Sequence, residues 1–169
     1  CLVGSEMCIR DRCIPIVADA VTLHPHGDQS VYSAFTLMTD ENGSCNVPMF
    51  NGLGNLGKVY LSRKPADMRY PKAKVSENIE DLFKDKEVME LVPAEEGVGM
   101  EPKVLNAIYP LILINGTMGI AVSVGTKIPS FNFSDVIDLT IKYLRNGSLE
   151  ITDIIDPDFP TGGILVKND

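Results

Sequence analysis

The residue pair with the greatest chemical potential in this sequence is Arg69-Tyr70, which lies in a run of basic residues. A tyrosine with an ordinary pKa near 10 is only about 0.1% ionised at neutral pH, so it is a poor nucleophile without help. A neighbouring guanidinium can favour the phenolate and hold a phosphate oxygen. A tyrosine–phosphate bond would conserve the energy of a broken phosphodiester, so resealing would need no external energy. From spacing alone, packing or stacking is the commoner role for such a tyrosine.

Charge is distributed unevenly along the chain. The 169 residues carry a net charge of −8, which alone argues against a nucleic-acid partner. Positions 77–101 are strongly acidic, which is typical of a solvated face. Positions 58–74, in contrast, hold six basic residues against the single acid Asp67, a net charge of +5. Basic loops beside a DNA-binding helix pair grip phosphates, so we expect DNA contacts from Lys58, Arg63, Lys64, Lys72 and Lys74.

Two further motifs resemble cofactor sites, but their contexts argue against that function. Gly52-Leu-Gly-Asn-Leu-Gly57 spells G-x-G-x-x-G, and Glu77 lies 20 residues further on, as in a dinucleotide-binding fold. The last glycine of that fold must open a helix, whereas the β-prone Lys58-Val-Tyr-Leu follows here. His24 and His26 form an H-x-H pair without the additional ligands that zinc requires. We therefore expect a tight glycine loop, a structural turn at the histidines and no metal site.

The hydrophobic pattern predicts two helices joined by a tight turn, which is the helix-turn-helix arrangement. The first helix covers positions 14–22. The second begins at Asp28, its expected N-cap, and its expected apolar stripe is Val31, Ala34, Phe35 and Met38. Glycine-rich positions 46–60 then predict a β-loop or wing, and positions 61–74 predict a basic loop.

The second half of the chain mixes predicted helices and strands, so the expected fold class is α/β in the broad sense, or α+β. Positions 77–91 predict a moderately amphipathic helix. Positions 111–114 and 120–124 predict two strands around a turn at Asn115-Gly116. Ser134 is expected to cap a helix that runs to Asn146 and stops at Gly147.

Composition indicates a folded protein rather than a disordered or membrane-spanning one. Hydrophobic residues make up 44% and charged residues 22%, and no apolar run approaches the length of a membrane helix. Positions 1–12 resemble a translated sequencing adapter, and we treat the remainder as an internal fragment of a longer protein. Cys13 and Cys45 lack metal-ligand spacing, which fits small apolar fillers in a reducing cytoplasm.

Six blocks in a fixed order carry a resemblance to a known family. Its first three blocks are His24-Pro-His-Gly-Asp28, Asn51-Gly-Leu-Gly-Asn-Leu-Gly57 and Ala66-Asp-Met-Arg-Tyr70. Its last three blocks are Asn115-Gly-Thr-Met-Gly-Ile-Ala-Val122, Lys127-Ile-Pro129 and Pro157-Asp-Phe-Pro-Thr-Gly-Gly163. From about residue 13 to 169 the chain resembles the A subunit of bacterial type IIA topoisomerases, DNA gyrase and topoisomerase IV. The resemblance implies a truncated winged-helix domain over 13–108 and the start of an α/β tower domain over 109–169.

The resemblance also implies residue roles. Tyr70 matches the nucleophile that forms a 5′-phosphotyrosyl link, and Arg69 matches the arginine that stabilises the phosphoryl transition state. His26 matches a residue near the scissile phosphate. His24, Gln29 and Ser30, at the start of the implied recognition helix, match DNA-contacting positions. Ile128 matches an apolar wedge that intercalates and bends DNA, although its pattern alone favours an ordinary loop anchor.

As implied by the resemblance, the whole enzyme is an ATP-hydrolysing A2B2 assembly in the bacterial cytoplasm, associated with the nucleoid. Its partners are double-stranded DNA, a B subunit that carries the Toprim and ATPase domains, and a second copy of the A subunit. Mg²⁺ is held mainly by the B subunit, which also binds ATP, so this fragment alone is expected to be inactive. The alternative is a DNA-binding module, or a diverged paralogue, that does not cleave DNA.

Overall fold

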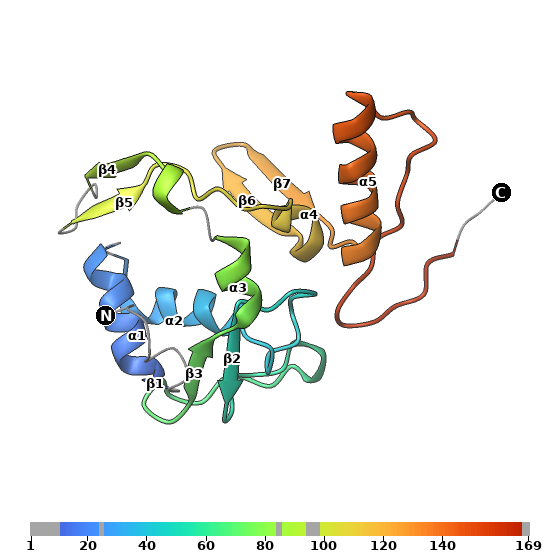
Figure 1. Ribbon diagram of the computed structural model, residues 1–169. Coiled ribbons are helices and arrows are strands. Elements are labelled where there is room, and N and C mark those ends of the chain that lie inside the picture. Colours follow the sequence, from blue (N-terminus) through green and yellow to red (C-terminus); the bar gives the residue numbers. More distant parts are fainter. Residues whose placement is uncertain (1–10, 24–25, 84–85, 94–98, 167–169) are drawn as a thin grey trace.

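The computed structural model describes residues 11–23, 26–83, 86–93 and 99–166, which form a mixed α+β fold (Figure 1). No described helix combines the length and the apolar character needed to cross a membrane. The elements near the N-terminus are β1 (Asp11–Arg12), α1 (Cys13–Leu23), α2 (Asp28–Leu37), β2 (Phe50–Leu53) and β3 (Lys72–Val75). They are followed by α3 (Glu77–Leu82), β4 (Leu91–Pro93), β5 (Met100–Pro102), α4 (Leu111–Asn115), β6 (Thr117–Ala121), β7 (Val124–Ile128) and α5 (Phe133–Asn146).

The first half packs α1 and α2 against a three-stranded antiparallel sheet of order β1-β3-β2. Strand β2 pairs with β3 from Phe50 opposite Val75 to Leu53 opposite Lys72. The core between helices and sheet consists of Cys13, Val17, Tyr32, Phe35, Leu56 and Ala73, each at most 4% exposed. Asp11 and Arg12, within the segment interpreted as adapter-derived, pair with Ala73 and Lys72 in this sheet.

Helix α2 differs in detail from the sequence prediction. Its N-cap is Gly27, and the Asp28 carboxylate instead accepts a hydrogen bond from the Gln29 N–H inside the first turn. The predicted stripe was partly right, because Phe35 is buried and Val31 packs against the core. Ala34 is exposed, however, and Tyr32 and Thr36 are buried instead. The phenol of Tyr32 is amphipathic and was not counted as a core residue, although aromatic rings bury well once the hydroxyl has a partner.

The segment from 77 to 91 is not one helix. Helix α3 ends at Leu82, a 3-10 turn covers Lys86–Val88, and β4 begins at Leu91. A second apolar cluster of Leu82, Phe83 and Met89, on which Ile79 also packs, holds this segment against Met49, Tyr109 and Leu111. The apolar residues that predicted a long helix therefore pack in this cluster from a chain that bends after α3.

The prediction of strands at 111–114 and 120–124 was also wrong, because the first range is helical and the second contains the turn of a hairpin. Residues Leu111–Asn115 form the short helix α4, and the hairpin is made by β6 and β7, with Thr117 opposite Ile128. Its turn lies at Val122 and Ser123, and Ser123 has a φ of 65°. A run of four apolar residues cannot distinguish a strand from a buried helical turn.

Helix α5 begins and ends close to its predicted bounds. The cap is Asn132, whose side-chain oxygen accepts from the Ser134 N–H at 2.9 Å, so Ser134 is inside the helix rather than its cap. Gly147 ends the helix with a φ of 75°, and its N–H donates to the Tyr143 carbonyl at 2.8 Å. The left-handed conformation explains why glycine stands at this stop.

Leu56 offers a test of the first core. It is 0% exposed between the helix pair and the sheet, so truncation leaves a cavity. Leu56→Ala is expected to lower the free energy of unfolding by about 2–5 kcal/mol, measured by urea unfolding. Leu53, at the end of β2 and 52% exposed, is the control. Leu53→Ala should change the free energy of unfolding by less than about 0.5 kcal/mol. Equal effects would contradict this packing.

Candidate functional site

Tyr70 lies at the end of the long connection between β2 and β3, two residues before β3 begins. Tyr70 is 70% exposed, whereas the aromatic residues Tyr32 and Phe35 of the adjacent core are buried. Tyr70 ends a turn that is closed by a hydrogen bond from its N–H to the Asp67 carbonyl at 3.0 Å. A phenol in this position is available to a large external ligand rather than used for packing.

Arg69 forms a fork with Asp67. Its Nε donates to Asp67 Oδ1 at 2.9 Å and its Nη2 donates to Oδ2 at 3.0 Å. These hydrogen bonds lower the pKa of the Asp67 carboxyl to about 2. The guanidinium carbon also lies 5.7 Å from the centre of the Tyr70 ring. A guanidinium that binds a carboxylate in this way has the geometry to bind a phosphate.

Tyr32 anchors this loop to α2 and is a site residue that the sequence analysis missed. Its hydroxyl donates to the Ala66 carbonyl at 2.7 Å, across 34 residues of sequence. Burial, with smaller contributions from Cys13 and Asp67, raises the pKa of Tyr32 to about 12, so the hydroxyl keeps its proton to donate. The only sign of this role in the sequence was the position of Tyr32, an aromatic residue directly after Val31, the first residue of the predicted apolar stripe.

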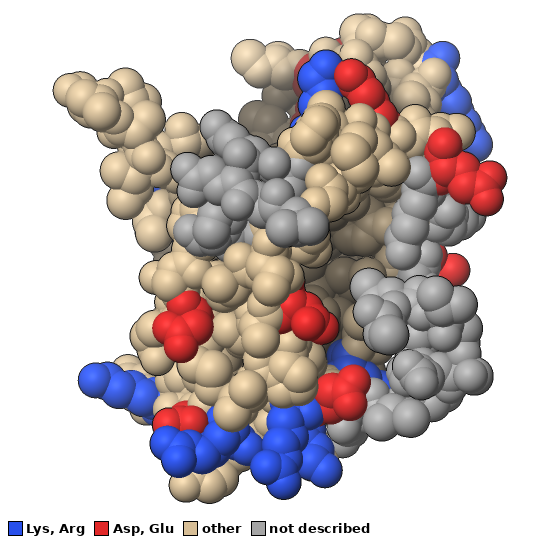
Figure 2. Space-filling view, turned by 90° about the vertical axis from the view of Figure 1, so that its left-hand side faces the viewer, with Lys and Arg blue, Asp and Glu red and all other residues tan. Residues whose placement is uncertain are grey.

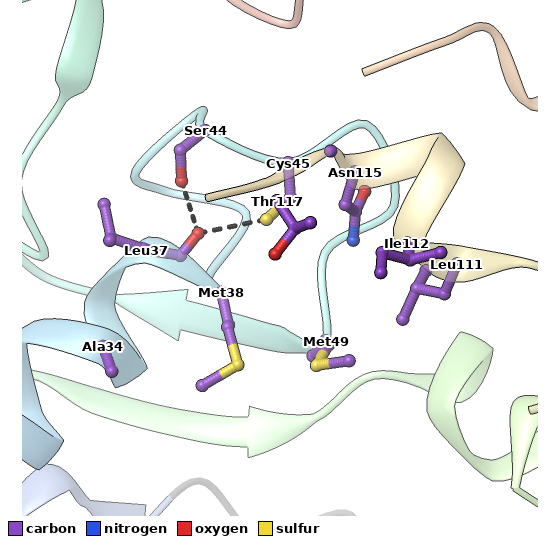
Figure 3. Close-up of a pocket in the computed structure, with 11 residues that line it drawn as sticks. Ala34, Leu37, Met38, Ser44, Cys45, Met49, Leu111, Ile112, Asn115 and Thr117 are labelled. Atoms are coloured by element: carbon purple, nitrogen blue, oxygen red, sulfur yellow. Dashed lines mark hydrogen bonds between the residues drawn. The ribbon is translucent and has the colours of Figure 1, made fainter. Parts of the chain in front are cut away.

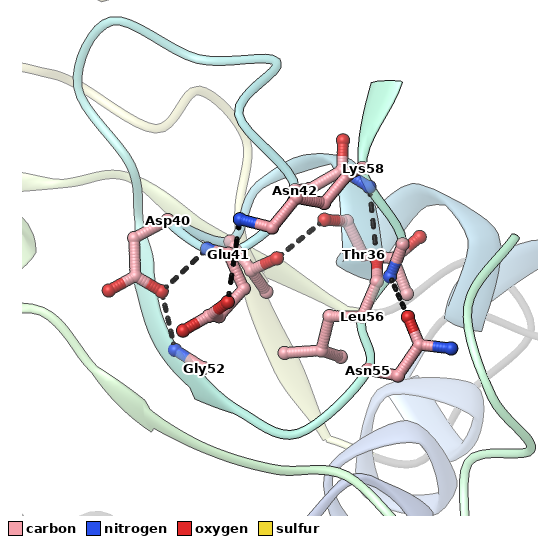
Figure 4. Close-up of polar contacts among 10 residues, drawn as sticks. Thr36, Asp40, Glu41, Asn42, Gly52, Asn55, Leu56 and Lys58 are labelled. Carbon is pink, nitrogen blue, oxygen red and sulfur yellow. Dashed lines mark hydrogen bonds and ion pairs between the residues drawn. The ribbon is translucent and has the colours of Figure 1, made fainter. Parts of the chain in front are cut away.

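A polar network shapes the glycine loop that precedes the Tyr70 segment (Figure 4). The Asp40 carboxylate accepts from the Gly52 N–H at 2.6 Å, and Asn42 Nδ2 donates to the Leu56 carbonyl at 3.0 Å. Gly57 has a φ of +84°, and a Cβ there would meet the Arg63 carbonyl at 3.0 Å. A 3-10 turn rather than a helix N-terminus follows, which confirms a tight loop and leaves no cradle for a pyrophosphate.

The basic residues that the sequence singled out gather around the sheet. Arg63, Lys64 and Lys72 are exposed, whereas Lys58 and Lys74 are half-buried. Lys58 lies 3.7 Å from the Glu41 carboxylate. Lys72 and Lys74 belong to strand β3, not to a loop as predicted. Figure 2 shows Lys and Arg side chains concentrated at the lower end of one face, the end where the three-stranded sheet lies in Figure 1.

The remaining predicted residues lie at two other places. His26, Gln29 and Ser30 are exposed at the start of α2, and His24 lies outside the described residues. Ile128 is half-buried at the end of β7, in a hairpin that is separate from the three-stranded sheet (Figure 1). The fold thus brings Arg69 and Tyr70 together but holds Ile128 on a different unit. Among the described residues, no three His, Cys, Asp or Glu side chains are grouped to hold a metal ion.

Comparison with known proteins assigns the family. Residues 10–169 match the family model for the A subunit of DNA gyrase/topoisomerase IV. The chain is 39% identical over 160 residues to the DNA gyrase A subunit of Rickettsia conorii, a match that covers 89% of this chain and 17% of the relative. It is 34% identical over 162 residues to the A subunit of DNA topoisomerase 4 from the same organism, which covers 92% of this chain and 22% of the relative.

A third relative, the A subunit of DNA topoisomerase 4 from Staphylococcus epidermidis, is 38% identical over 148 residues, 84% of this chain and 18% of the relative. The chain therefore spans about a fifth of the length of these curated relatives. Because the match with the family model extends over nearly the whole chain, this chain belongs to the family of DNA gyrase/topoisomerase IV A subunits.

Proposed function

We propose that this chain is the part of a type IIA topoisomerase A subunit that breaks and rejoins DNA through Tyr70. The observation that carries the proposal is the exposed Tyr70 phenol beside the Arg69 guanidinium, in a loop fixed to α2 by Tyr32. Membership of the family supports it. The complete enzyme would act in the bacterial cytoplasm, at the nucleoid, with DNA, a B subunit, plus a second copy of the A subunit.

The finer fold assignment belongs to the same proposal. In it, α1 and α2 form the helix-turn-helix, α2 is the recognition helix, and the β2–β3 ribbon with its long connection is the wing. The packing of α1 and α2 against the sheet supports this interpretation. Residues 13–108 would then form the winged-helix domain, and residues 109–169 would begin the tower domain.

The chemistry requires a single displacement in each direction. Tyr70 Oη attacks the phosphorus, the new O–P bond forms, and the bond from phosphorus to the 3′ oxygen breaks. The phenol proton passes to water, and the 3′ oxygen takes up a proton from water and departs as a hydroxyl. Arg69 must exchange the Asp67 carboxylate for a phosphate oxygen to stabilise the transition state, with His26 close to the same phosphate. Resealing reverses each step.

The implied cofactors are assigned to the partner. The described residues group no three carboxylate, thiol or imidazole ligands, so the metal does not fit a site made by these residues. We propose that the B subunit holds Mg²⁺ and binds ATP. Every step assigned to this chain therefore concerns the phenol, the guanidinium and the imidazole.

Cleavage by the complete enzyme tests the proposal. End-labelled duplex is incubated with the parent A subunit together with its B subunit, and the reaction is stopped with detergent. We expect protein-linked DNA whose 5′ ends resist a 5′-specific exonuclease while the 3′ ends remain free. Binding without any covalent product, which the alternative of a non-cleaving DNA-binding module predicts, would contradict the proposal.

Phosphate contacts by the basic residues give a second expected result. Lys64 is exposed and lies in the β2–β3 connection, so Lys64→Gln in the complete enzyme should reduce the slope of log affinity against log salt concentration by about 0.9. Lys103, which pairs with Glu90 at 3.1 Å, is the control, and Lys103→Gln should leave the slope unchanged. Fluorescence anisotropy over a salt series measures both. Equal slopes for Lys64→Gln and the parent would remove Lys64 from the interface.

A further inference from the structure

Two asparagines far apart in the sequence fasten the first half of the chain to segments that flank the β6–β7 hairpin in the second half. The Val47 N–H donates to Asn115 Oδ1 at 2.8 Å, and Asn115 Nδ2 donates back to the Val47 carbonyl at 2.8 Å, across 68 residues. This side chain therefore replaces one complete backbone pair of a sheet. We name Asn46 and Asn115, with their hydrogen bonds, the amide clasp.

Asn46 binds three segments at once. Its Nδ2 lies 3.1 Å from the Ile114 carbonyl, 3.1 Å from the Phe131 carbonyl and 3.0 Å from the Asp158 carbonyl. One amide nitrogen carries two hydrogens, so at least one is shared between two carbonyls. The end of α4, the start of the segment leading to α5 and the loop near 158 thus converge on one half-buried side chain.

The clasp connects to Tyr70 through the β2–β3 ribbon and to Ile128 through Gly116. Three residues after Val47 the chain enters β2 at Phe50, which lies opposite Val75, and Tyr70 lies beyond the other end of this ribbon, two residues before β3 begins. On the other side Asn115 is followed by Gly116, where an added Cβ would meet the Ile128 carbonyl at 2.8 Å. Gly116 therefore lies directly against the backbone that carries Ile128.

Apolar packing is incomplete at this junction. A cavity of about 570 Å³ opens beside the clasp, between the last turn of α2, the loop that follows it and α4 (Figure 3). Leu37, Met38 and Met49 line one side, and Leu111, Ile112 and Asn115 line the other. The hydrogen bonds of the clasp therefore hold the two units together alongside the apolar contacts of the second cluster, to which Met49 and Leu111 belong.

We propose that Asn46 and Asn115 are positioning residues that set where Ile128 stands relative to Tyr70. The inference rests on the proposed function and on the wedge role that the family resemblance implies for Ile128, because it matters only if Ile128 bends the duplex that Tyr70 cuts. A wedge and a nucleophile on separate units must be held in register, since a misplacement of about 1 Å can reduce a reaction by about a hundredfold. The clasp is the polar link between the two units.

The test compares intact duplex with a duplex that carries a short mismatch where the wedge would insert, and so kinks at little cost. In the complete enzyme, Asn46→Ala and Asn115→Ala should reduce adduct formation on intact duplex about tenfold or more. On the mismatched duplex they should stay within about twofold of the parent. Ile128→Ala should reproduce this pattern and add nothing to either clasp variant, because all three act on one step.

Asn106→Ala, at an exposed asparagine before α4, is the control and should behave as the parent enzyme does. If Asn115→Ala does not fold, Asn115→Asp carries the test, because it keeps the acceptor for the Val47 N–H and replaces the donor to the Val47 carbonyl with a charged oxygen. Equal losses on both duplexes, or effects that add to those of Ile128→Ala, would overturn the proposal.

A failure of the proposed function would be visible separately. In that case the parent enzyme would form no adduct on either duplex. The clasp would still be tested by energy transfer between dyes on the two arms of bound DNA. A smaller bend with the clasp variants than with the parent would support the inference, and an unchanged bend would overturn it.

Discussion

Tyr70→Phe in the complete enzyme is expected to reduce covalent DNA adducts by about a thousandfold or more, because the substitution removes the only atom that forms the bond to phosphorus. DNA affinity should change little, since the ring remains and the exposed phenol has no role in the core. Detergent-stopped cleavage with end-labelled duplex measures the adducts, and anisotropy measures binding.

Tyr60 provides a matched control for this experiment. It lies in the same β2–β3 connection, is 56% exposed, and also has a cation near its ring, with Lys58 Nζ at 5.8 Å from the centroid. Tyr60→Phe should leave adduct formation within about twofold of the parent. Adducts that persist with Tyr70→Phe and disappear with Tyr60→Phe would show that the nucleophile is Tyr60 instead.

Arg69→Ala is expected to reduce the cleavage rate at saturating DNA by about a hundredfold to a thousandfold, the usual effect of removing one donor that stabilises a developing charge. Arg69→Lys should recover only part of the rate, because an ammonium cannot form the two-pronged contact that Arg69 now makes with Asp67. Single-turnover cleavage separates this loss from weaker binding.

Arg63 is the control for Arg69, since it is an exposed arginine of the same connection. Arg63→Ala should weaken binding and leave the rate at saturating DNA nearly unchanged. Equal rate losses for both arginines would contradict a transition-state role for Arg69.

The pH dependence of cleavage should contain no contribution from Asp67. Its pKa is lowered from 3.8 to about 2 by Arg69, so the ion pair is fully formed above 3.8 and is lost only as the pH falls through about 2. Phosphate must therefore displace an ionised carboxylate from Arg69 across the whole working range. A step in the cleavage rate between about pH 5 and 9 that disappears with Asp67→Asn would contradict this assignment.

The sequence was most informative where a local rule acts alone. Gly147 stops α5 because only glycine adopts its φ without strain, and the basic run around Tyr70 is visible without a structure. The exposure of Tyr70 and the pairing of Arg69 with Asp67 depend on a turn only a few residues long.

Long-range contacts explain what the sequence could not supply. The apolar run at 111–114 is typical of a strand, but residues Leu111–Asn115 form helix α4, and its last residue hydrogen-bonds to Val47 far away in the sequence. Tyr32 could not be recognised as the anchor of the Tyr70 loop, because its partner Ala66 lies 34 residues away. The same holds for Asn46, whose partners lie 68 to 112 residues further along the chain. Such pairs leave no local periodicity in the sequence.

The most direct test of the central claim is to find which side chain carries the DNA. The covalent complex of the parent enzyme is digested with nuclease and protease, and mass spectrometry identifies the peptide that retains a nucleotide. We predict a 5′-linked nucleotide on Tyr70. A nucleotide on any other residue, with Tyr70 unmodified in the same complex, would contradict the role proposed for this phenol.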